Sequence, residues 1–583
     1  MFSSMHRGMM VLVLATIFAL CTLSEAGNKP VITTSLGDVR GFEHTSENSF
    51  KANIFLGLPY ASPPVGPLRF KKPEPVHPWS DVRDAIEWPR GCVPCMRASE
   101  RKVLNNANNG EDCLYLNVFA PTTSSDASSG YPVMIYVHGG GYNIGSTFEY
   151  GYESLVRNFV SRGVVVVTIQ YRMGPLGFFS TGDSALPGNL GYWDQTLALR
   201  FVNEHIASFG GDATKITVFG ESAGAGSVGA LTVSPHSRDL FAQAVEMSGA
   251  TVADWAQGPR VVEDSRQLAH DLDCRQEQSD AVIDCLRSKT VEEIQDAHKT
   301  RGFSRNHPNF IKFGPRVDGD FFPKPIEELI AEAPKKPSIL GACDTEGGFF
   351  SVPPMFIGNP LNVRPEEFAT YNYERFEKFV REIVATPSAY GNKAIIAQEL
   401  MLHHYIHSKG DWKNNTFALE KYTEFLSDYM FNVPIYHEAQ LKNSNGWPTW
   451  FYSYDHLNVD ALPKNHPVKG AFHTMELPYI FGMVILGKYE FNEDDLIMED
   501  LLATVLTNFA KYGNPTPKAV HGIVWEQLSS SKPHQYARLL PKPTMELTYR
   551  RDTVAFWTQL LPKLTGHSSQ PTESTPTHGR TEL

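Results

Sequence analysis

The chain has only one long hydrophobic run and no cluster of basic residues. The run extends from Met9 to Cys21, and no later stretch of the 583 residues is apolar enough to cross a bilayer. The net charge is −12 at pH 7, and lysine and arginine never gather into a run. A nucleic-acid surface needs clustered positive charge, so that class of partner is excluded. The sequence also lacks internal repeats, which leaves a large globular protein without a membrane span in its mature part.

The single hydrophobic run has the form of a secretory signal peptide. It is shorter than the roughly 20 residues of a spanning helix, so an uncleaved membrane anchor is the less favoured alternative. Ser24-Glu25-Ala26 supplies small residues at the third and first positions before a cut ahead of Gly27. We therefore expect three parts: a signal peptide over residues 1–26, one folded domain over residues 27–565, and a Ser/Thr/Pro-rich tail over residues 566–583.

The composition of the central part suits a large core. Hydrophobic residues make up 42% of the chain and aromatic residues 11%, which is enough for a substantial apolar interior. Strand-like apolar runs at Val133–Val137, Val164–Ile169 and Ile216–Phe219 alternate with helical segments. This alternation predicts an α/β fold with a mostly parallel sheet covered by helices.

The segment Gly220-Glu221-Ser222-Ala223-Gly224 has the pattern of a nucleophile elbow. It lies between a β-branched stretch and a small-residue stretch, as a sharp strand-to-helix turn requires. The bare pattern Gly-x-Ser-x-Gly would occur by chance in about one such chain in four, so the flanking context carries the assignment. We expect Ser222 to be presented as a catalytic nucleophile.

A glycine cluster upstream has a matching role. The strand-like run that ends at Val137 is followed by His138-Gly139-Gly140-Gly141-Tyr142, and no side chain shields the glycine N–H groups. Such donors can stabilise the oxyanion of acyl transfer, together with the N–H of the residue after the nucleophile. The predicted donors are those of Gly140, Gly141 and Ala223, although a glycine-rich turn can also be purely structural.

With these two motifs, the chain resembles a type-B carboxylesterase, a member of the group that includes carboxylesterases and cholinesterases. The resemblance implies the α/β-hydrolase fold, with a large, mostly parallel central sheet and helices on both faces. It spans almost the whole mature chain and is carried by seven ordered motifs: residues 57–66, EDCLYLNVFAP at 111–121, the glycine cluster, QYRMGPLGF at 170–178, GNLGYWDQ at 188–195, FGGDATKITVFGESAG at 209–224 and HTMELPYIFG at 473–482.

The remaining catalytic residues follow from chemistry and from this resemblance together. A serine needs an adjacent base, and the base needs an acid that fixes its tautomer. In this fold the chain order is serine, acid, histidine. His473 lies in a segment that resembles the family's histidine loop, and Glu346 precedes a glycine as the family's acid does. Asp344, two residues earlier in the same loop, is the competing acid.

These residues imply a two-step ester hydrolysis. Ser222 attacks the ester carbonyl while His473 takes its proton, the alcohol leaves, and water then releases the acid from the acyl-enzyme. The scheme requires neither a metal ion nor a cofactor. Because an imidazolium cannot accept the serine proton, activity is expected to fall as the pH drops through about 6.5.

Removal of the signal peptide would leave six of the seven cysteines. The resemblance implies the disulfides Cys95–Cys113 and Cys274–Cys285, with Cys92 as a competitor for Cys95. A zinc or redox site at Cys92-x-x-Cys95 is a weaker alternative because no second pair of ligands lies near it. Cys343, beside the expected acid, is predicted to be a buried free thiol.

The carboxyl end suggests a cellular address. The tail has no apolar segment for a lipid anchor, and it ends in Arg580-Thr581-Glu582-Leu583. This ending resembles the Lys-Asp-Glu-Leu class of retention signals. It favours the lumen of the endoplasmic reticulum over secretion. Asn414-Asn415-Thr416 is the glycosylation acceptor sequence, which predicts a glycan on Asn414.

The substrate is restricted but not identified by the sequence. Cholinesterases carry a tryptophan before the EDCLYLN motif for a cation–π contact, whereas this chain has Lys102-Val103-Leu104-Asn105 there. Choline esters are therefore disfavoured, and Glu221 in place of glutamine disfavours a juvenile-hormone esterase. Tyr142, Phe349 and Phe350 either line an apolar pocket or pack in the core. We expect hydrolysis of small to medium carboxylic esters, lipid-like or xenobiotic.

Two alternative functions stay open at this point. A lipase would differ from an esterase only in its preference for long acyl chains. A non-catalytic adhesion or partner-binding protein of the same family would lack the serine and carry a membrane span. This sequence has the serine at position 222, and it has no apolar stretch long enough to span a membrane after the signal peptide.

Overall fold

The structure of the protein is a computed structural model that describes residues 29–95, 108–302, 304–353, 359–410, 414–483, 485 and 489–566. The expected signal peptide, the segment Lys102-Val103-Leu104-Asn105 and the tail beyond Gly566 lie outside the described residues.

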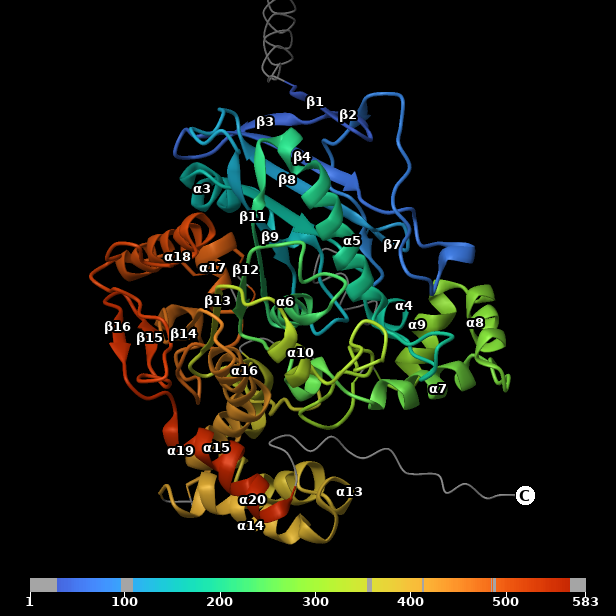
Figure 1. Ribbon diagram of the computed structural model, residues 1–583. Helices are drawn as coiled ribbons and strands as arrows, with labels where there is room; N and C mark the ends of the chain where they lie inside the picture. Colours follow the sequence, from blue (N-terminus) through green and yellow to red (C-terminus); the bar gives the residue numbers. More distant parts are fainter. Residues whose placement is uncertain are drawn as a thin grey trace, which may run out of the picture.

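An eleven-stranded sheet runs through the described part of the chain (Figure 1). Its spatial order is β16-β15-β14-β13-β12-β11-β9-β10-β8-β4-β3. Neighbouring strands from β10 across to β15 are parallel, and β3, β4, β8 and β16 are antiparallel to their neighbours. The strands are β3 (Phe42–Thr45), β4 (Lys51–Pro59), β8 (Tyr115–Pro121), β9 (Tyr131–Val137), β10 (Val165–Ile169), β11 (Gly211–Glu221), β12 (Gln243–Met247), β13 (Ser338–Cys343), β14 (Thr449–Tyr454), β15 (Tyr536–Leu539) and β16 (Thr544–Glu546).

The central strands are buried on both faces. Every residue of β10, β12, β13 and β14 is buried. Strands covered by helices on both sides are expected to be nearly continuous apolar runs, as Val165–Ile169 is. The predicted mostly parallel sheet is therefore confirmed, and its three recognised strand-like runs are β9, β10 and the end of β11.

Helices cover both faces of this sheet. On one face, α5 packs against α6, α6 against α10, and α10 against α16. On the other face, α3, α17 and α18 form a separate group (Figure 1). The α-helices are α3 (Glu153–Asn158), α4 (Gly174–Phe178), α5 (Leu190–His205), α6 (Ala223–Val233), α7 (Arg260–Asp271), α8 (Ser279–Ser288), α9 (Val291–Thr300), α10 (Ile326–Glu332), α11 (Gly348–Ser351), α12 (Tyr373–Phe379), α13 (Pro387–Tyr390), α14 (Ala394–Leu402), α15 (Asn415–Ser427), α16 (Val433–Ser444), α17 (Leu477–Phe481), α18 (Glu493–Tyr512), α19 (Arg551–Ala555) and α20 (Leu561–Thr565).

Shorter elements complete the fold. Two small sheets are formed by β1 (Val31–Thr34), β2 (Gly37–Arg40) and β5 (Arg83–Asp84), and by β6 (Gly91–Cys92) and β7 (Asn109–Gly110). The π-helical turns are Val380–Val384, His403–His407, Asp428–Asn432 and Phe556–Leu560. The 3₁₀ turns are Gly66–Leu68, Thr147–Tyr150, Val160–Arg162, Ile206–Phe209, Asp254–Ala256, Pro365–Thr370, Gly391–Lys393 and Val459–Ala461.

The carboxyl ends of the central strands carry the expected functional residues. Ser222 follows β11, Glu346 lies three residues after β13, and His473 lies in the connection after β14. The carboxyl ends of parallel strands share one edge of the sheet, where ligands bind in open α/β folds. Among the described residues, none of the helices has both the length and the hydrophobicity that crossing a membrane demands.

Candidate active site

The turn at Ser222 has a strained backbone. Strand β11 ends at Glu221 and α6 begins at Ala223, so one residue makes the whole reversal. Ser222 has φ 59° and ψ −124°, values that residues with a side chain seldom adopt. Its N–H donates to the carbonyl oxygen of Met247 at 2.9 Å, and its carbonyl accepts from Gly226 at 3.0 Å. These bonds hold the turn, and the serine side chain remains half-buried rather than enclosed.

Two glycines make the sharp turn sterically feasible. A Cβ on Gly220 would lie 2.5 Å from the carbonyl carbon of Gly224, and a Cβ on Gly224 would lie 2.0 Å from the oxygen of Val137. Both separations are too short for any side chain. The Gly-x-Ser-x-Gly spacing is therefore a packing requirement of this turn.

The glycine cluster after β9 lies beside the serine. A Cβ on Gly139 would be 3.0 Å from the Cβ of Ser222, and the next two residues have positive φ, 102° at Gly140 and 59° at Gly141. Within the described part of the chain, the N–H groups of Gly140 and Gly141 find no acceptor. Ala223 is the first residue of α6, where helical N–H groups are also left over. The structure thus brings the three expected donors into the neighbourhood of the serine.

His473 is paired with Glu346. Its Nδ1 lies 2.5 Å from Glu346 Oε2, and both side chains are buried. The other carboxylate oxygen, Oε1, accepts the main-chain N–H of Cys343 at 2.7 Å. The competing acid, Asp344, accepts instead from the N–H of Ala471 at 2.7 Å. Of the two acids left open by the sequence, Glu346 is the one that contacts the histidine.

The other ring nitrogen of His473 faces Glu221. Nε2 lies 3.2 Å from Glu221 Oε1, and Glu221 is the residue immediately before Ser222. Within the described residues, Ser222 Oγ has no hydrogen-bond partner of its own. Hydrogen bonds to a catalytic serine are often loose before substrate binds. The imidazole therefore lies between a carboxylate on its Nδ1 side and the nucleophile turn on its Nε2 side.

A third carboxyl group, Glu476, is close enough to His473 for its charge to raise the pKa of the imidazole. Ser248 Oγ donates to Glu476 Oε1 at 3.1 Å, and Cys343 Sγ donates to Oε2 at 3.1 Å. The sequence alone assigns no catalytic role to Glu221 or Glu476, although both lie inside motifs of the family resemblance, at 209–224 and 473–482. The sequence signal for these two residues is a carboxyl group close to the predicted nucleophile or the predicted base. We call His473, Glu221, Glu346 and Glu476 the histidine cluster.

Burial and charge in the histidine cluster raise the pKa values of both Glu221 and His473. Burial raises the pKa of Glu221 to about 8, although the nearby imidazole opposes the shift. Burial alone would lower the pKa of His473, but the charges of Glu221 and Glu346 outweigh it and raise that pKa to about 9. Because each group shifts the other, the Glu221–His473 pair titrates as a unit.

Aromatic rings enclose the histidine on one side. The ring centroids of Phe349, Phe350 and Phe431 lie 5.6, 5.4 and 4.5 Å from that of His473. The two phenylalanines singled out in the sequence therefore flank the site. Tyr142 instead packs in the core, where its hydroxyl lies 3.1 Å from that of Tyr192.

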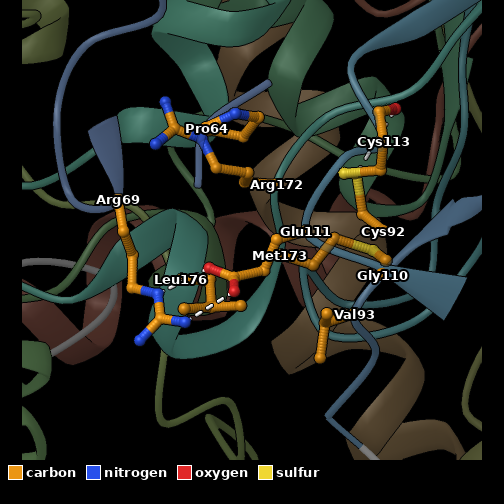
Figure 2. Close-up of a pocket in the computed structure, with 10 residues that line it drawn as sticks. All are labelled: Pro64, Arg69, Cys92, Val93, Gly110, Glu111, Cys113, Arg172, Met173 and Leu176. Atoms are coloured by element: carbon orange, nitrogen blue, oxygen red, sulfur yellow. Dashed lines mark hydrogen bonds and ion pairs between the residues drawn. A yellow bond between two sulfur atoms is a disulfide. The ribbon is translucent and has the colours of Figure 1, made fainter. Parts of the chain in front are cut away.

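One predicted disulfide is wrong and the other is confirmed. Cys113 is bonded to Cys92, not to Cys95, as Figure 2 shows. Cys95 is a buried free thiol. Its N–H is bound to the carbonyl of Asn143, and its Sγ lies 3.1 Å from Nδ1 of His298. These contacts hold Cys95 away from Cys113.

The structure also shows the state of the other cysteines. A disulfide-bonded Cys92 cannot serve the alternative zinc or redox pair. The Cys274–Cys285 disulfide is present, and Cys343 is a buried free thiol as predicted. In the described part of the chain, no three His, Cys, Asp or Glu side chains are grouped as metal ligands would be.

A small cavity beside the Cys92–Cys113 disulfide is distinct from the candidate active site. Figure 2 shows it lined also by the Arg69–Glu111 pair, in which two nitrogen–oxygen contacts measure 2.6 Å each. Its lining residues include none of the residues expected to act on substrate. Asn414, the expected glycan acceptor, is exposed at the beginning of α15, and its Oδ1 accepts the N–H of Thr416 at 3.0 Å.

The sequence matches known proteins over nearly its whole length. Residues 28–557 match the model of the carboxylesterase family. The chain is 38% identical to gut esterase 1 of Caenorhabditis briggsae over 86% of this chain and 87% of that protein. It is 33% identical to human cocaine esterase over 93% and 94% of the two chains, and 31% identical to mouse neuroligin-2 over 92% of this chain and 68% of the relative. With a family match over nearly its whole length and a serine turn, glycine loop and buried Glu–His pair at one sheet edge, the chain belongs to the carboxylesterase family and is a carboxylesterase.

Proposed function

We propose that this carboxylesterase cleaves small to medium carboxylic esters, lipid-like or xenobiotic, through an acyl-enzyme on Ser222. The observation that carries the proposal is the 2.5 Å contact between His473 Nδ1 and Glu346, next to the strained turn that presents the serine. The Glu346 contact fixes the tautomer with the Nδ1 proton, so that Nε2 is free to act as a base.

The first half-reaction transfers the acyl group to the enzyme. Ser222 Oγ adds to the ester carbonyl, and its proton passes to Nε2 of His473. The resulting oxyanion accepts from the N–H groups of Gly140, Gly141 and Ala223, each of which typically contributes about 2.7–4 kcal/mol to such a transition state. The imidazolium then gives the proton to the departing alkoxide, and an alcohol leaves.

The second half-reaction returns the enzyme. Water adds to the acyl carbon while Nε2 takes a proton, and the carboxylic acid is released as Ser222 Oγ recovers its proton. Glu346 stabilises the imidazolium in both halves without being protonated. Glu221, 3.2 Å from Nε2, stabilises the same cation. The phenylalanine rings of Phe349, Phe350 and Phe431 supply apolar surface beside the base.

The pH dependence follows from these carboxyl groups. Because the charges of Glu221 and Glu346 raise the pKa of His473, the acid limb of the rate profile should lie above the ordinary histidine value near 6.5. The direction of this shift refines the expectation drawn from the sequence. A rate that stayed flat down to about pH 5 would contradict the role of His473 as a base.

The cellular setting we propose is the secretory pathway, with the endoplasmic reticulum lumen favoured over secretion. The two disulfides support an oxidising compartment. The exposed Asn414 side chain is accessible for a glycan, and the final Arg580-Thr581-Glu582-Leu583 supplies the retention signal. Replacing Leu583 would then move the protein from cell lysate to medium.

The proposal is tested with p-nitrophenyl esters of increasing acyl length, using the mature protein and Ser222→Ala in parallel. Turnover by the wild type that is lost in Ser222→Ala would support the nucleophile, and an optimum at short or medium acyl chains would support the substrate class. An optimum at long chains would indicate a lipase instead. A wild type that is inert on every ester would overturn the proposal and favour a partner-binding role.

A further inference from the structure

Three charged side chains are enclosed in the core behind the nucleophile turn. Glu246 lies on β12, and Glu438 and Lys442 lie one helical turn apart on α16. All three side chains are completely buried. Lys442 Nζ contacts Glu246 Oε1 and lies 3.0 Å from Glu438 Oε1. We call these residues the lysine cluster.

The lysine cluster carries one more carboxyl group than cation. Two carboxylates and one ammonium would leave a net negative charge in the core, which is strongly unfavourable without further partners. The two carboxyl groups also converge. A Cβ placed on Gly229 of α6 would lie 2.9 Å from Glu438 Oε1 and 3.1 Å from Glu246 Oε2. Glu246 Oε2 accepts no hydrogen bond from the described residues, and Glu438 Oε1 has the Lys442 ammonium at 3.0 Å as its partner. One proton between the two carboxyl groups removes both the excess charge and the contact between acceptors.

The two glutamates differ in their other contacts, and this difference locates the proton. Glu438 Oε2 accepts the main-chain N–H groups of Thr251 at 2.7 Å and Val252 at 3.3 Å, and such donors favour an ionised carboxylate. Glu246 receives no main-chain donor in the described structure. Burial raises the pKa of Glu246 well above its ordinary value, although Lys442 opposes the shift.

The segment bound by Glu438 also supports the nucleophile turn. The segment starts at Met247, the last residue of β12, whose carbonyl accepts the N–H of Ser222 at 2.9 Å. Two residues later, a Cβ on Gly249 would be 2.2 Å from the carbonyl oxygen of Ser222. The main chain of residues 247–249 is thus packed against the serine, and residues 251–252 are fixed by the carboxylate.

We propose that Glu438 is a positioning residue for the nucleophile turn, ionised and hydrogen-bonded to a protonated Glu246, and that it holds residues 247–252 against Ser222. The proposal rests on the proposed function in one respect, that Ser222 is the nucleophile. Glu438 does not touch substrate; it acts through the main chain of Thr251 and Val252.

The test compares two matched isosteric variants of the full-length mature protein, Glu246→Gln and Glu438→Gln. A glutamine at 246 reproduces a protonated glutamate, since its amide can donate to Glu438 and its oxygen can accept from Lys442. A glutamine at 438 must either direct an amide group at the Lys442 ammonium or lose the acceptor for Thr251 and Val252. We expect Glu246→Gln to keep kcat within about twofold, and Glu438→Gln to lose about 100-fold in kcat with little change in KM.

Each outcome decides the proposal. Equal kcat losses in the two variants would overturn the assignment of the proton. A wild-type kcat in a Glu438→Gln protein with a lowered Tm would reduce Glu438 to a purely structural residue. If Glu438→Gln fails to fold, Gly229→Ala serves in its place, because its methyl group displaces the same carboxyl pair from the side of α6. An unchanged kcat in Gly229→Ala would then contradict the positioning role.

Failure of the proposed function gives a different pattern. In that case the wild type is inactive, or Ser222→Ala is as active as the wild type. The thermal unfolding of the two glutamine variants still reports on the proton without any ester turnover. An unchanged Tm in Glu246→Gln together with a lower Tm in Glu438→Gln supports the assignment, and equal shifts contradict it.

Discussion

The histidine cluster and the lysine cluster are two solutions to one electrostatic problem. Each surrounds a buried basic group with carboxyl groups, and each lies at the same few central strands. In both, the carboxyl groups raise the pKa of the base against the effect of burial. Lys442 therefore keeps its proton at all physiological pH values, whereas an imidazole can release one. Ser222, half-buried, lies beside only the histidine cluster.

Carboxyl groups around a buried base therefore do not by themselves make a catalytic site. The lysine cluster has a fixed charge distribution that can only hold the main chain in place. The charge distribution of the histidine cluster changes with each proton transfer, and the cluster lies next to the half-buried Ser222. Variants of the two clusters and of one exposed ion pair test this distinction.

Glu346→Gln should give the largest effect on turnover. The amide cannot stabilise the imidazolium and can select the wrong tautomer of His473, so kcat should fall by about 10⁴-fold. The free energy of unfolding of Glu346→Gln, measured in urea, should change much less than kcat does. A loss of less than about tenfold would contradict the role of Glu346, and Asp344→Asn serves as the control because that carboxylate binds Ala471 rather than the histidine.

Lys442→Met should act mainly on stability. It removes the only cation of the lysine cluster and leaves a buried carboxylate without its partner, which typically costs about 3–5 kcal/mol. The free energy of unfolding, measured in urea together with active-site titration, checks this value. A change below about 1 kcal/mol would mean that the cluster does not depend on its charge pairing.

Glu221→Gln should shift the pH profile rather than abolish activity. Loss of a negative charge 3.2 Å from His473 Nε2 makes the imidazolium less stable and lowers its pKa. The acid limb of kcat/KM should therefore move to lower pH by about one unit. A shift to higher pH, or none, would contradict an electrostatic role for Glu221.

Glu263→Ala tests an exposed ion pair and should have the smallest effect. Arg266 Nη1 lies 2.7 Å from Glu263 Oε2, but the side chains are 69% and 57% exposed. Surface pairs of this kind contribute about 0.2–1 kcal/mol. Thermal unfolding should show a small change, and kcat should not change at all. A destabilisation equal to that of Lys442→Met would show that burial is not what separates the clusters from ordinary ion pairs.

The sequence is most informative where a backbone turn dictates residue type. The spacing of Gly220, Ser222 and Gly224 is required by contacts below 3 Å, so these residue types alone are enough to predict the turn. The choice of Glu346 over Asp344 needs the family resemblance, because two residues of one loop have nearly equal access to an imidazole. The structure shows that only one of them contacts His473.

Features that depend on distant packing could not be predicted. Cys92 and Cys95 lie at similar distances along the chain from Cys113, and the choice between them is made by contacts of Cys95 with Asn143 and His298. The lysine cluster is likewise hidden in the sequence. A glutamate inside the apolar strand β12 is a signal for it, but its partners lie almost 200 residues later on α16, and sequence spacing does not pair them.

The strained backbone of Ser222 carries a consequence for the evolution of this protein. At φ 59° and ψ −124°, a glycine would fit with less strain than the serine does. Ser222→Gly should therefore fold into a more stable protein that no longer hydrolyses esters, by the kind of trade-off known between function and stability. If selection for ester hydrolysis is lost, replacement of Ser222 by glycine increases the stability of the protein. Catalysis is then lost while the fold stays intact.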